Sequence, residues 1–96
     1  MSRALTRVMD RIKKSVLDHE HVFTTHAESE MKQDRLDFVD VESALLTGTI
    51  ERVFEHDPRG LLYEVVGSAC DLLTRVGVVV RVEARTIIIT VYEIKP

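Results

Sequence analysis

Residues 76–94, VGVVVRVEARTIIITVYEI, decide the fold of this chain. They contain two β-branched runs that meet near Ala84 and Arg85, a composition typical of a β-hairpin. Because side chains alternate along a strand, a two-residue loop at this point predicts one wholly apolar face. The cross-strand pairs expected on that face are Val82 with Ile87, Val80 with Ile89, and Val78 with Val91. We expect this hairpin to form the centre of the sheet.

The opposite face of the same hairpin mixes apolar and polar residues. The expected pairs there are Glu83 with Thr86, Arg81 with Ile88, Val79 with Thr90, and Gly77 with Tyr92. Arg81, Thr90 and Tyr92 are therefore predicted to share this face.

The composition is that of one globular domain. The 96 residues are 45% hydrophobic and 30% charged, which suits a single modest core. No segment approaches the roughly 20 apolar residues that span a bilayer, and basic residues occupy the N-terminus where a signal peptide has its apolar core. We therefore expect no membrane association and a cytoplasmic location. The single Cys70 agrees with a reducing compartment, and no predicted base lies beside it.

Residues 2 to about 18 are expected to form an amphipathic helix with Ser2 as its N-cap. Its apolar residues recur at helical spacing: Leu5, Val8, Met9, Ile12 and Val16. This stripe packs either on the sheet or on another subunit, which makes the helix a candidate homo-oligomer interface. Residues 1–16 hold five basic residues and one acidic residue, a net charge of +4 in a chain whose total is −3. Such a segment is either a solvated helix face or a site for nucleic acid or an acidic partner.

Two shorter helices are expected next. Thr25 and Glu28 have the spacing of a capping box, which predicts a helix that runs to about Arg35. Asp37 is a suitable N-cap for a third helix, and Gly48 is suitable as the C′ residue that ends it.

The period then changes to that of strands. Residues 49–54 and 61–68 are strand-like, and Val22 with Phe23 could add a short extended piece after the first helix. With the hairpin, the order is three helices and then four antiparallel strands in a meander. We therefore expect a two-layer α+β domain, with the N-terminal helices packed on one face of a four-stranded antiparallel sheet.

Several short motifs together resemble one bacterial family. They are Thr24-Thr25-His26-Ala27 and Met31, Asp40-Val41-Glu42, Ala44-Leu45 and Gly48, Tyr63-Glu64-Val65-Val66-Gly67, and Ile89-Thr90-Val91-Tyr92-Glu93. In this order and spacing they are similar to domain-of-unknown-function family 4258 over about residues 21–94. That family usually has HA-x-x-R-M, and Glu30 stands where the Arg would be. Its members resemble the RelE and barnase-like RNase fold, which is common among toxins of toxin–antitoxin modules.

The resemblance implies a metal-independent endoribonuclease of the RelE type, with RNA as substrate and an antitoxin-type protein as partner. His26 lies at a helix start, where a neutral imidazole is a usable general base. Arg81 would bind phosphate and Tyr92 would stack a base. The expected catalytic residues are His26, Arg81, Thr90 and Tyr92.

Each of these residues also has a purely structural interpretation. His26 would pack on the sheet, Arg81 would pair with Glu83 or Glu64, and Tyr92 would cover the core. The alternative function is a non-catalytic protein-interaction domain on the same scaffold, which the acidic composition favours. The four His residues form no HExxH motif and there is no Cys pair, so we expect no metal and no other cofactor.

Overall fold

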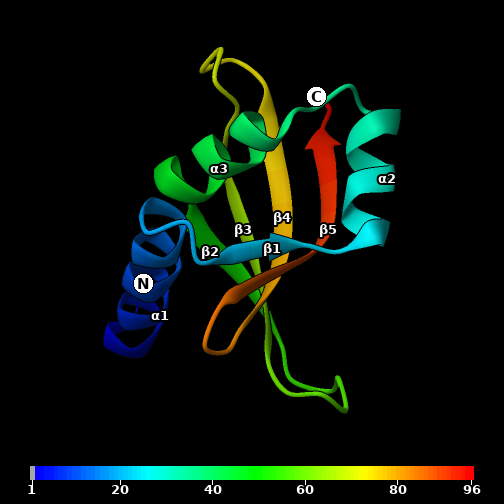
Figure 1. The fold of residues 1–96 in the computed structure, drawn as a ribbon. Helices are drawn as coiled ribbons and strands as arrows, with labels where there is room; N and C mark the ends of the chain where they lie inside the picture. Colours follow the sequence, from blue (N-terminus) through cyan, green and yellow to red (C-terminus); the bar gives the residue numbers. More distant parts are fainter. Residues whose placement is uncertain (1) are drawn as a thin grey trace.

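The computed structural model describes residues 2–96, which form three helices and a five-stranded mixed sheet (Figure 1). In chain order the elements are α1 Arg3–Leu17, β1 His21–Phe23, α2 Thr25–Gln33, α3 Phe38–Thr47, β2 Thr49–Phe54, β3 Leu62–Ser68, β4 Arg75–Val82 and β5 Thr86–Ile94. The strand order across the sheet is β1-β5-β4-β3-β2. The α+β class is as expected.

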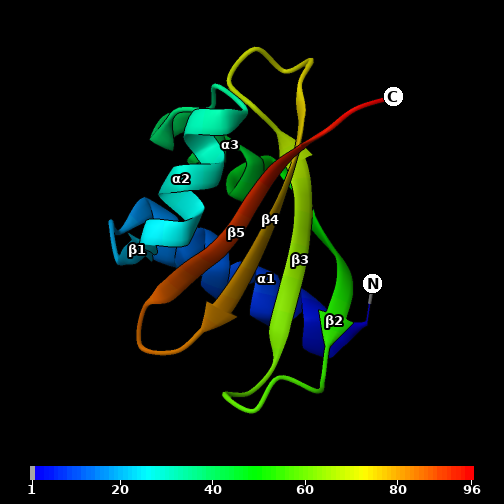
Figure 2. The same cartoon turned by 90° about the vertical axis from the view of Figure 1, so that its right-hand side faces the viewer.

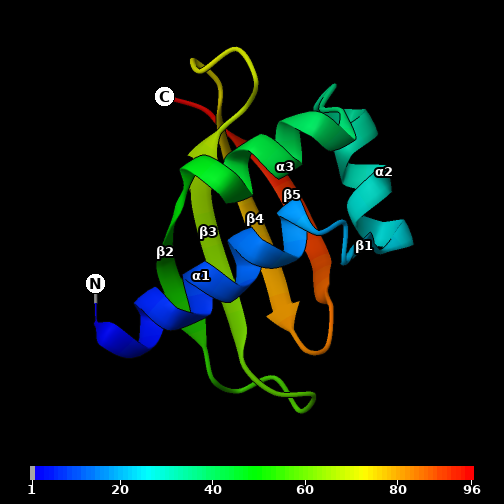
Figure 3. The ribbon, with the colours of Figure 1, turned by 60° about the vertical axis from the view of Figure 1, so that its left-hand side comes forward.

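The helices lie on one side of the sheet. Helices α1 and α3 cross the same face, as Figure 3 shows, and α2 runs along β5 (Figure 1). The other face carries no helix within residues 2–96 (Figure 2). We call it the uncovered face. The expected two-layer arrangement is therefore present.

The prediction of four antiparallel strands is wrong by one strand. Strand β1 pairs in parallel with β5, with His21 opposite Thr86 and Phe23 opposite Ile88. A strand of three residues is too short to show an alternating pattern. For this reason the sequence predicted only a short extended piece at Val22 and Phe23, and no pairing with the sheet. The Thr24 hydroxyl donates to the Ile88 carbonyl (3.0 Å), and this bond holds the end of β1 on the sheet.

The hairpin is the centre of the sheet, but only part of its expected register is correct. The observed pairs are Gly77 with Tyr92, Val78 with Val91, Val79 with Thr90, Val80 with Ile88, Arg81 with Ile87 and Val82 with Thr86. The first three match the expectation. The other pairs are shifted by one residue, because Ile89 forms a β-bulge and the loop has three residues instead of two.

The bulge exchanges the two faces of β5 on the loop side. Ile88 is fully buried beneath the helices, whereas Ile87 and Ile89, which were expected there, are only half-buried. A one-residue shift reverses the side to which every later side chain points. Arg81 still lies on the uncovered face, opposite Ile87.

The core lies between the helices and the covered face of the sheet. It includes Val65, Val76, Val78, Val80, Ile88 and Val91 from the strands and Met9, Ile12, Val16, Ala27, Met31, Val41, Ala44 and Leu45 from the helices. The buried apolar stripe of α1 therefore packs within its own domain. An additional role of α1 in a homo-oligomer stays a prediction.

Two of the expected helix caps are correct and one is displaced. Ser2 accepts a hydrogen bond from the Leu5 amide, and Asp37 is the N-cap of α3. The cap of α2 is Thr24 rather than Thr25: its hydroxyl accepts from the Ala27 amide (3.1 Å) while also donating to β5. These two hydrogen bonds of the Thr24 hydroxyl place the start of α2 one residue earlier than expected. The helix ends at Gln33.

Gly48 ends α3, but not in the left-handed conformation of a C′ glycine. Its φ is −91°, which other residues also adopt. Glycine is required for a different reason: a Cβ at this position would lie 2.5 Å from the Ala44 carbonyl oxygen and 2.6 Å from that of Val66. The absence of a side chain lets α3 lie close to the sheet.

Helix α2 covers the free edge of β5 with two carboxylates. Glu30 accepts a hydrogen bond from the Val91 amide (3.0 Å), and Asp34 accepts one from the Glu93 amide (2.9 Å). Residues four apart on a helix lie on the same side, which matches amides two apart on an edge strand. Unpaired strand edges promote aggregation, so these contacts protect the sheet. Glu30 therefore has a structural role at the edge of the sheet.

Candidate functional site

A carboxylate lies near the middle of the uncovered face. Glu64 on β3 accepts two hydrogen bonds from Arg52 on β2: from Nε to Oε1 (3.1 Å) and from Nη2 to Oε2 (3.3 Å). The Tyr92 hydroxyl on β5 donates to Glu64 Oε2. The Glu64 side chain is 9% exposed, whereas the Arg52 side chain is 65% exposed. We call Arg52, Glu64 and Tyr92 the Glu64 cluster.

A glycine on the strand between them allows Tyr92 to reach Glu64. Gly77 on β4 is paired with Tyr92, and Val79 is paired with Glu64. A Cβ on Gly77 would lie 2.2 Å from Cζ of the Tyr92 ring and 2.5 Å from its hydroxyl oxygen. The phenol therefore lies flat across β4 and places its hydroxyl beside β3.

The cluster fixes the protonation of its members. The hydrogen bonds from Arg52 hold the pKa of Glu64 below its usual value, against the opposing effect of burial, and Tyr92 adds to this lowering. Burial and the bond to Glu64 raise the pKa of Tyr92 to about 12. At neutral pH, Glu64 is therefore an ionised acceptor and Tyr92 a protonated donor.

Arg81 lies on the same face, closer to the hairpin loop. Its side chain is only 11% exposed, and Nη2 lies 3.4 Å from Asp57 Oδ1. Nε lies 4.0 Å from Glu83 Oε2 and has no hydrogen-bond partner within the described residues. The structural interpretation paired Arg81 with either Glu83 or Glu64. Glu83 lies near Arg81, whereas Glu64 forms its hydrogen bonds with Arg52 instead.

Thr90 lies on the uncovered face as well, paired with Val79 and half-buried. Three of the four expected catalytic residues, Arg81, Thr90 and Tyr92, thus share one face of the hairpin. None of the hydrogen bonds or ion pairs described for residues 2–96 joins any two of the four. Their catalytic role stays a prediction.

His26 lies on the first turn of α2, and none of the hydrogen bonds or ion pairs described for residues 2–96 joins it to the Glu64 cluster. Its side chain is 67% exposed, and Nε2 lies 3.3 Å from Glu30 Oε1. Glu30 in turn binds the Val91 amide at the strand edge. The polar contacts of His26 are thus directed to its own helix.

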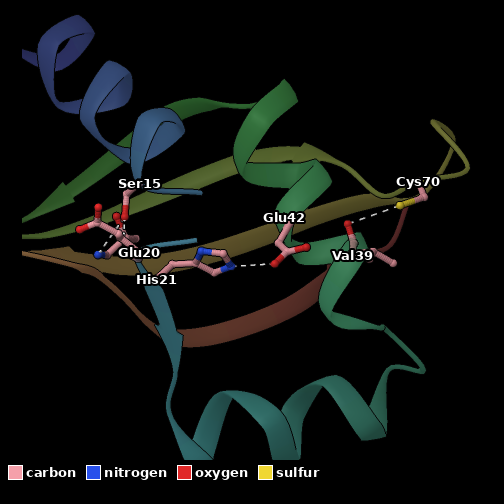
Figure 4. Close-up of polar contacts among 7 residues, drawn as sticks. Ser15, Glu20, His21, Val39, Glu42 and Cys70 are labelled. Carbon is pink, nitrogen blue, oxygen red and sulfur yellow. Dashed lines mark hydrogen bonds and ion pairs between the residues drawn. The ribbon is translucent and has the colours of Figure 1, made fainter. Parts of the chain in front are cut away.

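A second polar cluster lies on the covered side (Figure 4). His21 Nε2 is 2.7 Å from Glu42 Oε2 on α3, and the His21 side chain is almost fully buried. Nearby, the Cys70 thiol donates to the Val39 carbonyl (3.4 Å), and Ser15 donates to the Glu20 carbonyl. Desolvation and the Asp40 carboxylate raise the pKa of Cys70, which disfavours a nucleophilic thiolate. These contacts join the helices to β1 and to the loop after β3.

Two further features bear on the class of site. Among residues 2–96, no three His, Cys, Asp or Glu side chains are grouped so that they could hold a metal ion. None of the described helices is both long enough and apolar enough to cross a membrane.

These features define a two-layer α+β domain with one helix-covered face and one face that carries a charged, hydrogen-bonded cluster. The model of a family described as a domain of unknown function, DUF4258, matches residues 23–93, and the chain belongs to this family. The matched region includes the whole Glu64 cluster and leaves α1 outside. No curated protein and no solved structure matches the chain.

Sequence reasoning did not place Arg52 or Glu64 among the site residues. One signal was available: Glu64 interrupts the apolar run LLYEVV, and a charge within such a strand is costly unless it is paired. Arg52 gives no comparable signal. It contacts Glu64 only because β2 and β3 pair in a register that includes a bulge between Ile50 and Arg52.

Proposed function

We propose that the chain is a metal-independent endoribonuclease of the RelE type, controlled by an antitoxin-type protein, and that the uncovered face is its substrate face. The observation that carries the proposal is the Glu64 cluster. It combines an ionised carboxylate, an exposed guanidinium and a protonated phenol on a face that carries no helix within residues 2–96. These groups can supply the general base, the positive charge and the general acid for cleavage of RNA by its own 2′-hydroxyl.

In the proposed reaction the RNA 2′-oxygen attacks the adjacent phosphorus. Glu64 accepts the 2′-hydroxyl proton, and Arg52 stabilises the negative charge that develops on the phosphoryl oxygens. The bond from phosphorus to the 5′-oxygen breaks, and that oxygen takes a proton from an acid such as the Tyr92 hydroxyl. The products are a 2′,3′-cyclic phosphate and a free 5′-hydroxyl.

Substrate binding would itself activate Glu64. The hydrogen bonds from Arg52 are the main reason that the Glu64 pKa is low. Because the Arg52 side chain is mostly exposed, a bound phosphate can compete for it. Any weakening of that ion pair makes Glu64 a stronger base at the moment when the substrate is present. Arg81, which is already close to Asp57, would supply a second positive charge.

One observation favours the alternative of a non-catalytic protein-interaction domain. Arg52 and Arg81 are each already paired with a carboxylate. A face whose cations are internally neutralised attracts phosphate weakly. In that case the Glu64 cluster would stabilise the sheet and present a polar surface to a protein partner.

Induction in a bacterial host that lacks the partner separates these two functions. The wild-type chain, Glu64→Gln and His26→Ala are expressed to equal soluble levels, and growth and transcript integrity are followed. We expect the wild type to stop growth and fragment transcripts, and Glu64→Gln to do neither. Loss of activity in His26→Ala but not in Glu64→Gln would show that His26, and not Glu64, is the general base. A soluble wild-type chain that leaves growth and RNA intact would support the interaction domain.

A further inference from the structure

The exposed side of α1 carries a row of cations. Arg3, Arg7, Arg11 and Lys14 recur every three or four residues, so they line one side of a helix with 3.6 residues per turn. All four are exposed, whereas the buried residues of α1, which are Met9, Ile12 and Val16, lie on its opposite side. We call these four residues the α1 stripe.

The side of α1 that carries the stripe keeps a net positive charge. Lys14 pairs with Asp18, and helical spacing places Asp10 on the same side as the stripe. Arg11 donates to the Glu83 backbone carbonyl (3.2 Å), a contact that leaves its positive charge unpaired. Within residues 2–96, Arg3 and Arg7 form no ion pair. Since residues 1–16 carry +4 and the whole chain −3, the remaining residues carry −7.

Helix stability does not account for this row. Arg3 is the first residue of α1, and the first turn contains no acidic residue. The helix dipole disfavours a cation at this end. The stripe also makes no contribution to the buried core. A ligand of opposite charge would account for both its position and its exposure.

We propose that the α1 stripe binds the phosphate backbone of RNA, an inference that rests on the proposed endoribonuclease function. The stripe contains no apolar or aromatic side chain, and such side chains form the centre of most protein–protein interfaces. A row of cations about 6 Å apart along a helix suits a regularly charged chain. The stripe also lies outside the family-matched residues 23–93, so it adds a contact to the domain that holds the Glu64 cluster.

The test measures binding separately from cleavage. The probe is a fluorescent 2′-O-methyl oligouridylate of about 12 nucleotides, which has no free 2′-hydroxyl to attack phosphorus. Its affinity for the full chain is measured by anisotropy at increasing salt. For Arg3→Gln with Arg7→Gln we expect a salt slope shallower by about 1.4, since each lost phosphate contact removes about 0.7 on single strands. At about 0.1 M salt, this corresponds to a loss of affinity on the order of 10-fold or more.

The control removes the same charge elsewhere. Lys32→Gln with Lys95→Gln changes α2 and the C-terminal segment, which lie away from α1 (Figure 1). We expect its salt slope to equal that of the wild type. Equal slopes for all three proteins would overturn the inference. Displacement of the probe by poly-glutamate at the same charge concentration would also overturn it and assign the stripe to an acidic protein. Binding through the stripe without cleavage of ordinary RNA would leave this inference standing and remove only the proposed enzymatic activity.

Discussion

The two faces of the sheet are built from the same strands but have opposite chemistry. On the covered face, β4 contributes Val76, Val78 and Val80, all fully buried. On the uncovered face, the alternate residues of β4 are Gly77, Val79 and Arg81, next to the Glu64 cluster. Burial in the core explains these three valines completely. The uncovered face holds a network whose charges must be paired at a cost in desolvation, and this cost suggests a function.

The largest difference between the faces should appear when the same polar residue is placed on each. Val80→Asn loses the burial of a valine and introduces an amide without partners, a cost of about 3–5 kcal/mol. Val79→Asn, one residue away on the half-buried uncovered face, should cost less than about 1 kcal/mol. Chemical denaturation of both variants measures these values. Equal losses would show that the uncovered face is also core.

The next largest effect should come from Gly77. Gly77→Ala places a methyl group against the Tyr92 ring and should destabilise the fold by about 2–3 kcal/mol. In a Tyr92→Ala background the ring is absent, so the same substitution should cost almost nothing. A double-mutant cycle measures this coupling. Additive effects would mean that glycine is needed at position 77 for a reason other than the space that it leaves for the Tyr92 ring.

Tyr92 should also make the stability depend on alkaline pH. Its folded pKa of about 12 lies above the ordinary value of 10, so its contribution is complete below pH 10 and is lost as the pH rises towards 12. The loss should be on the order of 2 kcal/mol. Thermal melting of the wild type and Tyr92→Phe across this range tests it. The difference between the two proteins should shrink as the pH rises, and a constant difference would contradict the assignment.

The smallest effect concerns the edge that separates the two faces. Glu30→Ala and Asp34→Ala each remove the acceptor of one β5 amide and should cost about 1 kcal/mol each. The double variant should also aggregate faster, because it exposes the edge of β5. Light scattering during incubation measures this, with Glu28→Ala on the exposed side of α2 as control. If the Glu28→Ala control aggregates as fast as the double variant, Glu30 and Asp34 do not protect the edge of β5.

The sequence predicted the covered face better than the uncovered one, for a physical reason. Burial of β-branched residues is a local pattern, and it identified the hairpin at the centre of the sheet. The bulge at Ile89 left no signal, because Ile87, Ile88 and Ile89 are alike and any one of them could face the core. Strand β1 was missed as a strand because three residues show no period.

The Glu64 cluster depends on contacts between strands rather than on any motif. Arg52, Glu64 and Tyr92 come together only when β2, β3 and β5 are in register and Gly77 leaves space for the ring. Of the expected site, the shared face of Arg81, Thr90 and Tyr92 could be predicted from alternation alone. The contact of His26 with Glu30, which itself binds the Val91 amide, could not, since it depends on how α2 packs along β5.

The central claim is that the Glu64 cluster is a catalytic group on the uncovered face, and RNA cleavage by the purified chain tests it most directly. The substrates are an RNA oligonucleotide and the same oligonucleotide with a 2′-deoxy residue at the cleaved position, with chelator present. We predict cleavage of the first only, with a 2′,3′-cyclic phosphate product, and a rate about 10²–10⁴-fold lower for Glu64→Gln. A Glu64→Gln protein that is folded and cleaves at the wild-type rate would contradict the claim.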